Sequence, residues 1–331
     1  MIPFGAVGPS AGPREKTRAM PWYKGNLHCH SARSDGRASP ADVARYYRFQ
    51  GHDFLGLSDH NRRIPLADWA DPAAILGIPC CEYSGEAFCH VLGVGVREAV
   101  APAPSRRRKP RPAAVIIQDG IDRTLAAGGI PVVCHPAWRW ALGFDELSGL
   151  RRGRHFEICN ASPDCNAFPI PGHEPLDNLW DRLLTGGRRW FGLANDDAHD
   201  YFSPPRPRSP QGGTGYNVVR APALTRRHVL VAIERGRFYA TTGVEIDRYR
   251  VTRAGVSLRV RPQLEEKTSI QFFGAGGREL ARVIGHRAAY RFRGDEVYVR
   301  VRIASTAGLW AWTQPVFLDD LADAIAWTHA G

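Results

Sequence analysis

Short apolar runs alternate with amphipathic stretches along the first 243 of the 331 residues, and polar loops join them. This alternation is typical of β-strand and α-helix units, which assemble into a parallel sheet or barrel. The expected strands span residues 22–29, 53–58, 77–83, 87–96, 129–134, 155–159 and 190–194. The expected helices span residues 118–127, 175–184 and 226–235, and a further helix begins at Pro40 behind the N-cap residue Ser39 and ends at Gly51.

The pattern changes after residue 243. Apolar and polar residues now alternate singly, as in 248–251, 257–260 and 297–302, and glycines and charged residues separate these segments. A period of two predicts half-buried strands, so we expect a small antiparallel β domain at 244–318 and a short tail at 319–331. The α/β region then spans 21–243, and the Gly- and Pro-rich segment 1–20 is expected to be a disordered leader.

Composition places the chain among globular proteins. With 44% hydrophobic and 23% charged residues, the chain can bury a large core. It has no apolar run of about eighteen residues, and its first twenty residues lack the apolar centre of a secretory signal, so we expect a cytoplasmic protein without a membrane span. The seven cysteines are odd in number and lack paired zinc spacings, which favours reduced thiols in the core.

The net charge of +11 comes mainly from arginine. Its densest run, residues 106–111, is interrupted by proline and is expected to form a solvated loop rather than a nucleic-acid patch. A nucleic-acid partner is therefore not favoured. The positive field would still attract a small anionic substrate.

Histidines and carboxylates gather where the expected strands end. His28 and His30 point to the same side of an extended chain because they are two residues apart, and Asp197 and His199 repeat that spacing. Further residues of this kind at or after strand ends are Asp35, His60, Glu82, His90 and His135. The other six histidines are expected to be ordinary surface or core residues.

Imidazole and carboxylate ligands without thiolate suit Zn²⁺, Mn²⁺ or Fe²⁺. Two such ions about 3.5–4 Å apart can share a carboxylate and a hydroxide, which lowers the pKa of the attacking water and stabilises the attacking and leaving oxygens. A P-loop and a dinucleotide fingerprint are both absent from the sequence. The pattern therefore predicts a metal-dependent hydrolase.

Five short motifs, in order along the chain, resemble those of the PHP (polymerase and histidinol phosphatase) superfamily of metal-dependent phosphoesterases. They are His28-Cys29-His30, Asp35-Gly36, Ser58-Asp59-His60-Asn61, His135-Pro136 and Asp197-Ala198-His199. The opening at residues 22–61 is similar in particular to the branch that includes carbaryl-hydrolase-like metallohydrolases. The resemblance covers about residues 22–243, and it is more specific for the superfamily than for the substrate.

The resemblance implies an α/β fold with a distorted (β/α)7-type barrel, which carries two or three divalent ions at the C-terminal rim of its strands. It implies that one ion is held by His28, His30, Glu82 and Asp197. It implies that a second is held by Glu82, His90 and His135, and a third by Asp35, His60 and His199. Asp35 stands where some relatives have histidine.

Further roles are expected around these ligands. Asp197, His60 and His199 are the predicted catalytic residues, the two histidines assisting the leaving group. The predicted substrate-binding residues are Arg33, Asn61, Arg62 and Arg139, since an arginine offers two parallel donors to phosphoryl oxygens. Glu157 and Asn160 are expected to contact ligands from outside.

The leading hypothesis is hydrolysis of a small phosphorylated substrate. Two alternatives stay open. The same ions can hydrolyse a carboxylic ester, an amide or a carbamate, as the branch resemblance suggests. From a different class, the chain could be a noncatalytic basic binding module in which residues 244–318 bind nucleic acid.

Overall fold

The computed structural model describes residues 20–322, apart from residues 72, 105–108, 110, 166–169, 204–211 and 264–265. The expected leader therefore lies outside the described residues, except for its last position. Most of the basic run at 106–111 and of the expected tail at 319–331 lies outside them too.

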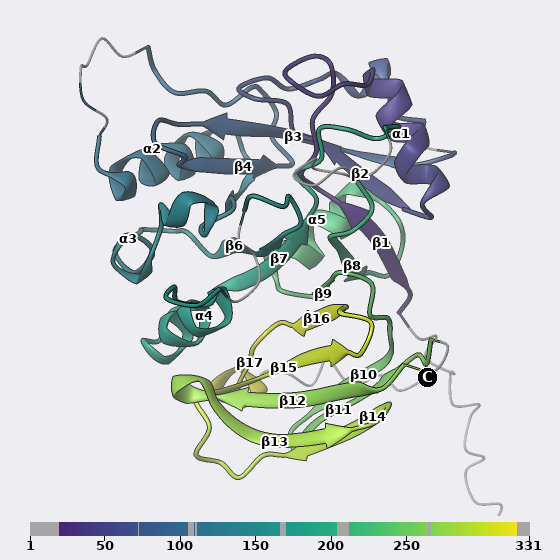
Figure 1. Ribbon diagram of the computed structural model, residues 1–331, viewed down its shortest axis with the longest axis vertical. Coiled ribbons are helices and arrows are strands. Elements are labelled where there is room, and N and C mark those ends of the chain that lie inside the picture. The colour runs from purple at the N-terminus through teal and green to yellow at the C-terminus, as the bar shows by residue number, and fades with distance from the viewer. Residues whose placement is uncertain are drawn as a thin grey trace, which may run out of the picture.

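The described residues form five α-helices, and up to residue 243 they form nine strands (Figure 1). The helices are α1 (Pro40–Phe49), α2 (Ala113–Ala126), α3 (Phe144–Ser148), α4 (Leu176–Thr185) and α5 (Arg226–Glu234). These strands are β1 (Trp22–Asn26), β2 (Phe54–Leu57), β3 (Leu76–Ser84), β4 (His90–Val94), β5 (Ile130–Val133), β6 (His155–Asn160), β7 (Phe191–Asn195), β8 (Tyr216–Arg220) and β9 (Phe238–Thr241).

Most of these elements follow from the sequence pattern. The start of α1 is confirmed, because the Ser39 hydroxyl accepts a hydrogen bond from the backbone N–H of Asp42 at 3.2 Å and Pro40 occupies the first turn. Gly51 follows the helix with a φ of +75°, a conformation that glycine adopts without strain. The pattern missed α3, which is only five residues long, and the strands β8 and β9.

The α/β fold is confirmed, with a sheet that is mostly parallel at its centre. Strands β1, β2 and β3 pair in parallel, as do β5, β6 and β7. Strand β4 lies antiparallel between β3 and β5, and β8 lies antiparallel to β1. The start of the antiparallel strand β4 and the C-terminal ends of the parallel strands therefore lie at one edge of the sheet.

A closed barrel is not confirmed, because no ladder among the described strands joins β7 to β8. Side-chain amides satisfy the free edge of β7 instead. Asn217 accepts from the backbone N–H of Ala194 at 3.1 Å and donates to its carbonyl at 2.7 Å. Gln314 makes the same pair of bonds to Gly192, at 2.9 and 2.8 Å. Two side chains thus replace the neighbouring strand that would close the barrel.

The antiparallel character expected after residue 243 is confirmed. The strands are β10 (Ile246–Thr252), β11 (Gly255–Val260), β12 (Thr268–Gly274), β13 (Arg278–Ile284), β14 (Arg287–Arg291), β15 (Tyr298–Ser305), β16 (Trp310–Thr313) and β17 (Val316–Phe317). Strands β10, β11 and β14 form a separate sheet, whereas β16 pairs with β9 and so continues the large sheet across residue 243.

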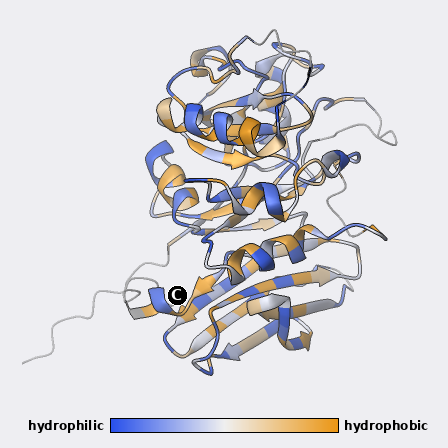
Figure 2. Cartoon of the chain, turned by 90° about the vertical axis from the view of Figure 1, so that its left-hand side faces the viewer, coloured by the Kyte–Doolittle hydropathy of each residue, from blue (hydrophilic) through white to orange (hydrophobic). Residues whose placement is uncertain are grey.

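A buried ion pair fastens the C-terminal strands to the α/β region. The guanidinium of Arg300 on β15 is 0% exposed and donates through Nε to Asp181 of α4 at 2.7 Å. The hydroxyl of Tyr298 donates to the same carboxylate at 2.7 Å. Helix α4 otherwise buries leucines and Trp180, and its hydrophobic and hydrophilic faces are visible in Figure 2.

All seven cysteines are free and buried, in agreement with the expected core thiols. In the described part of the chain, no helix combines the length and the apolar character needed to cross a membrane.

Candidate metal centre

The nine side chains predicted as metal ligands converge at one edge of the sheet. His28 and His30 follow β1, His60 follows β2, and Glu82 lies near the end of β3. His135 follows β5, while Asp197 and His199 follow β7. His90 begins β4, and it reaches the same edge because β4 is antiparallel to both of its neighbours. Asp35 lies in the loop between β1 and α1.

The carboxylate of Glu82 lies at the centre of this cluster and within 3.5 Å of five imidazoles. Its Oε1 atom is 3.4 Å from His28 Nε2, 2.9 Å from His90 Nδ1 and 3.5 Å from His135 Nε2. Its Oε2 atom is 3.4 Å from His30 Nε2 and 2.8 Å from His60 Nδ1. A carboxylate between two groups of imidazoles has the arrangement of a ligand that bridges two cations.

Asp197 joins the same cluster from β7. Its Oδ1 atom lies 3.1 Å from Nε2 of His28 and 3.0 Å from Nε2 of His30. His28, His30 and Asp197 therefore present one ligand atom each to a common point.

Asp35 marks the outer side of the cluster. Its Oδ2 atom lies 3.3 Å from Nε2 of His60 and 3.3 Å from Nε2 of His199, and its side chain is 52% exposed. By contrast, the side chains of His28 and Glu82 are 0% and 1% exposed. A solute therefore reaches the cluster from the side of Asp35, His60 and His199.

The cluster is built to hold positive charge. His28 Nε2, His30 Nδ1 and Glu82 Oε2 are buried polar atoms whose contacts within the cluster lack hydrogen-bond geometry, an arrangement that is costly unless a cation binds there. Burial alone would raise the pKa of Glu82, yet the imidazoles of His28 and His90 hold it well below its usual value. Burial alone would lower the pKa of His28, yet the carboxylates of Asp197 and Glu157 hold it well above its usual value. The residues present thus fit divalent cations, and their role as ligands stays a prediction.

Glu157 and Asn160 support the ligands from β6, as expected. Glu157 accepts from the backbone N–H of His135 at 2.8 Å through Oε2, and Asn160 donates to both Glu157 and Asp197, at 2.8 and 3.2 Å. Asn195 donates to the other oxygen of Glu157 at 2.9 Å. Because each of these groups is buried, the positions of the ligands depend on one connected hydrogen-bond network.

Two buried carboxylates that received no role from the sequence position the ligand loops. Asp59 accepts from the backbone N–H of Ser31 at 3.0 Å and from the Ser34 hydroxyl at 2.7 Å, and it thereby shapes the loop that carries Asp35. Asp196 accepts from the backbone N–H groups of Gly213 and Gly215, at 2.7 and 2.6 Å. Asp59 lies inside the motif Ser58-Asp59-His60-Asn61. Asp196 is the same residue type as its neighbour Asp197, and the side chains of the two point in different directions.

The backbone is strained where several ligands leave their strands. The φ angles of His135, Asp197 and Asn61 are +29°, +51° and +54°, in a region that residues with a Cβ rarely adopt. This strain turns the chain sharply at the sheet edge. Hydrophobic periodicity carries no signal for it.

The four predicted substrate-binding residues lie within four residues along the chain of predicted ligands, and their roles remain predictions. Arg33, Arg62 and Arg139 are exposed. Asn61 has a structural contact, because its side-chain oxygen accepts from the backbone N–H of Ser84 at 2.9 Å.

An aromatic wall, which we define as Phe88 and Trp138, stands beside two of the ligands. The ring of Trp138 lies 4.9 Å from that of His135 and 4.7 Å from that of Phe88, between centroids. The Arg139 guanidinium lies 5.7 Å from the Phe88 ring centroid. Phe88 is 42% exposed, so the wall presents apolar surface to solvent next to the cluster.

Cys134 also lies close to the cluster, although the sequence pattern assigned no chemistry to the cysteines. Its sulfur lies within 4.8 Å of ligand atoms of His28 and Glu82. Burial raises the pKa of this thiol well above its usual value, so a neutral thiol lies behind the imidazoles.

Part of the chain is similar in sequence to a known protein. A stretch of 145 residues is 28% identical to the 3′,5′-nucleoside bisphosphate phosphatase of Chromobacterium violaceum, and it covers 42% of this chain and 51% of that protein. The relative is a phosphatase. The expected resemblance to a superfamily of phosphoesterases is therefore confirmed, although the chain spans only about half the length of this relative. No protein-family model matches the chain.

Two solved structures align with the chain at low sequence identity. A two-domain protein from Bacteroides vulgatus, described as containing a predicted PHP-like metal-dependent phosphoesterase, has a TM-score of 0.47 and 14% identity, over 89% of this chain and 95% of that chain. An amidohydrolase from Chromobacterium violaceum, solved with bound sulfate and no metal, has a TM-score of 0.35 and 17% identity, over 53% of this chain and 87% of that chain.

Proposed function

We propose that this chain is a metal-dependent phosphoesterase that hydrolyses a small phosphorylated substrate. The observation that carries the proposal is the position of Glu82 among five imidazoles, with Asp197 and Asp35 completing the set on either side. The relative described as a phosphatase supports the same reaction class.

His28, His30, Glu82 and Asp197 would hold a first divalent ion. Glu82, His90 and His135 would hold a second, and Asp35, His60 and His199 a third. Zn²⁺, Mn²⁺ and Fe²⁺ all suit these nitrogen and oxygen ligands. When bound, such ions lower the pKa of water and neutralise charge on phosphoryl oxygens.

The side chains of the chain itself orient the substrate and move protons. His60 and His199 are 27% and 25% exposed at the open side, so when no third ion is bound either imidazole can donate a proton to the leaving oxygen from the solvent side. Arg33 and Arg62 extend from neighbouring loops and would bind phosphoryl oxygens not facing the cluster.

The aromatic wall indicates the class of leaving group. A flat ring carried by the leaving group can stack on Phe88 while the phosphoryl group faces His90 and His135. Aryl phosphates and nucleoside phosphates have this form, and the relative is named for a nucleoside bisphosphate.

The test compares metal content and hydrolysis for the wild-type chain and two double variants. In His28→Ala/His30→Ala we expect loss of bound metal and a fall in kcat/KM of at least about a thousandfold, because the ions contribute several kcal/mol to transition-state stabilisation. His228→Ala/His286→Ala is the matched control, since neither histidine belongs to the cluster. Circular dichroism verifies that both variants fold.

The substrate panel for protein loaded with Mn²⁺ or Zn²⁺ contains p-nitrophenyl phosphate, adenosine 3′,5′-bisphosphate, an alkyl phosphate and an aryl carbamate. We expect turnover of the phosphates, and a several-fold higher KM for the two aromatic phosphates but not for the alkyl phosphate in Phe88→Ala. Turnover of the carbamate alone would replace phosphoester hydrolysis by the alternative reaction class. Unchanged metal content and activity in His28→Ala/His30→Ala would refute the metal centre.

We further propose that residues 21–243 form the catalytic region and residues 244–318 a β domain that supports it. Support comes from the antiparallel pairing of the strands after residue 243 and from the separate sheet of β10, β11 and β14.

A further inference from the structure

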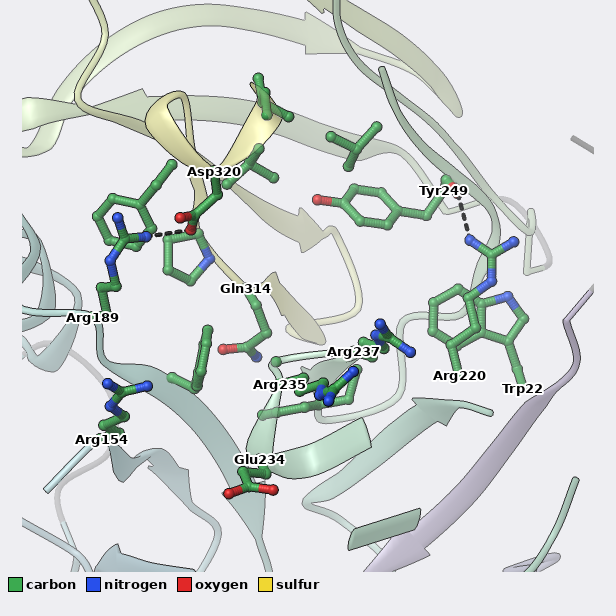
Figure 3. Close-up of a pocket in the computed structure, with 18 residues that line it drawn as sticks. Trp22, Arg154, Arg189, Arg220, Glu234, Arg235, Arg237, Tyr249, Gln314 and Asp320 are labelled. Atoms are coloured by element: carbon green, nitrogen blue, oxygen red, sulfur yellow. Dashed lines mark hydrogen bonds and ion pairs between the residues drawn. The ribbon is translucent and has the colours of Figure 1, made fainter. Parts of the chain in front are cut away.

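A cavity of about 460 Å³ lies between the α/β region and the C-terminal strands (Figure 3). Trp22 of β1, Phe191 of β7 and Phe238 of β9 border it from one side, and Tyr249 of β10 and Phe317 of β17 from the other. Its volume lies within the range of about 300–1,000 Å³ that is typical of small-molecule sites.

This cavity is remote from the metal centre. Trp22 and Phe191 are the first residues of β1 and β7, whereas His28 and Asp197 follow the last residues of the same strands. With a rise of about 3.3 Å per residue, six residues of strand separate the two places by roughly 20 Å. A ligand of the cavity is therefore not the molecule that meets the metal ions.

The charge of the cavity is strongly positive. Its lining contains five arginines and two carboxylates. The arginines are Arg154, Arg189, Arg220, Arg235 and Arg237. In Figure 3, Arg235 and Arg237 project between Arg189 on one side and Arg220 on the other.

One of the two carboxylates is already paired. Asp320 forms an ion pair with Arg189, which also meets Asp319 at 2.7 Å. The remaining carboxylate, Glu234, is exposed. Among the described residues, the lining therefore carries more positive than negative side chains.

Electrostatics and burial both favour an anion here. Burial lowers the pKa of Arg220, and burial together with the charge of Arg235 lowers that of Arg237. Both shifts mean that the positive charge is held at a cost, which a bound anion would reduce.

Most of the rest of the lining is apolar. The rings of Phe191, Phe238 and Phe317 and the side chains of Val251 and Val316 provide a surface for a flat hydrocarbon or aromatic group. A site that combines arginines with aromatic rings selects a molecule with both characters.

We propose that this cavity binds a small organic anion, with a phosphate, sulfonate or carboxylate group among the arginines and an aromatic or other apolar body against the phenylalanines. The site is separate from the metal centre and does not depend on the proposed reaction.

The test uses two fluorescent probes that share one ring system. The first, 8-anilinonaphthalene-1-sulfonate, carries the acid group, and the second, N-phenyl-1-naphthylamine, lacks it. Each is titrated into the full chain, into Arg154→Gln/Arg235→Gln and into the matched control Arg278→Gln/Arg291→Gln, whose arginines are exposed and lie outside the cavity.

We expect the sulfonate to bind the wild type and the control alike, and about fivefold more weakly to Arg154→Gln/Arg235→Gln, because two charge contacts are lost. The neutral probe should bind all three proteins equally. Absence of sulfonate binding to the wild type would refute the proposal. Equal sulfonate affinity in both double variants, or an equal loss for both probes, would refute it too.

Discussion

The Nδ1 atom of His28 lies 2.8 Å from Oε1 of Glu157, and both side chains are fully buried. In the neutral imidazole, a hydrogen bond from Nδ1–H to this carboxylate leaves the lone pair on Nε2, the atom that faces Glu82 and Asp197. Glu157 thus sets both the tautomer and the direction of a predicted metal ligand without being a ligand itself.

Replacing Glu157 by glutamine should weaken metal binding. The variant keeps the size of the side chain but removes the negative charge behind His28, so we expect the affinity for Zn²⁺ or Mn²⁺ to fall about 10- to 100-fold. Competition with a chelator measures this affinity. Glu174→Gln, which alters an exposed ion pair with Arg182, is the control and should bind metal as the wild type does. Equal affinity of the two variants would show that Glu157 has no positioning role.

The buried pair of Arg300 and Asp181 should contribute strongly to stability. Asp181→Ala removes the main partner of a buried guanidinium, so we expect the free energy of unfolding in urea to fall by about 3 kcal/mol. Asp319→Ala removes an exposed partner of Arg189 and should cost less than about 1 kcal/mol. Similar losses in the two variants would contradict the role assigned to burial.

A further prediction concerns Gln314, whose side-chain amide pairs with the edge of β7. Gln314→Ala leaves the N–H and carbonyl of Gly192 unpaired in a buried setting, which should destabilise the protein by about 2–3 kcal/mol in urea unfolding. Gln263→Ala removes a single half-buried bond to the Gly243 carbonyl and should cost about 1 kcal/mol or less. If Gln314→Ala is as stable as the control, the side chain does not substitute for a strand.

His52 should make stability fall in mild acid. Burial, and next the charge of Lys24, lower its pKa to about 3 in the folded chain, whereas the unfolded chain titrates it near its ordinary value. Below about pH 6.5 the unfolded state therefore binds the extra proton, and folding stability falls as the pH decreases towards 3. From pH 7 to pH 5 this loss is about 2 kcal/mol.

Urea unfolding at pH 7 and pH 5 measures the effect. His52→Leu should lose about 2 kcal/mol less than the wild type over this interval, and the exposed His173→Leu should lose as much as the wild type. An identical pH dependence in His52→Leu and the wild type would exclude His52 as the source.

Much of the metal centre could be anticipated from local order in the sequence. His28 and His30, and likewise Asp197 and His199, share a side of the chain because of their spacing after a strand. The order of motifs then pointed to a superfamily with a known set of ligands. Distances between segments, such as that between Glu82 and His60, follow only once β2 and β3 pair in parallel.

Other features depend on contacts between distant segments and have no periodic signal. Asp196 and Asp197 are adjacent carboxylates, yet the first accepts backbone N–H groups of the loop at 213–215 and the second faces the imidazoles. The edge of β7 is satisfied by Gln314, 122 residues away.

By itself, the sequence determined the α/β class, the antiparallel strands after residue 243 and the residue types of the metal centre, because periodicity and spacing act within a single strand or helix. The tertiary structure alone decided that the sheet stays open at β7, which carboxylates face the imidazoles and which contact the ligand loops, and that arginines from separate segments line a cavity. These outcomes depend on which segments meet in space, and the pairing of distant segments is set by packing of the whole core rather than by local pattern.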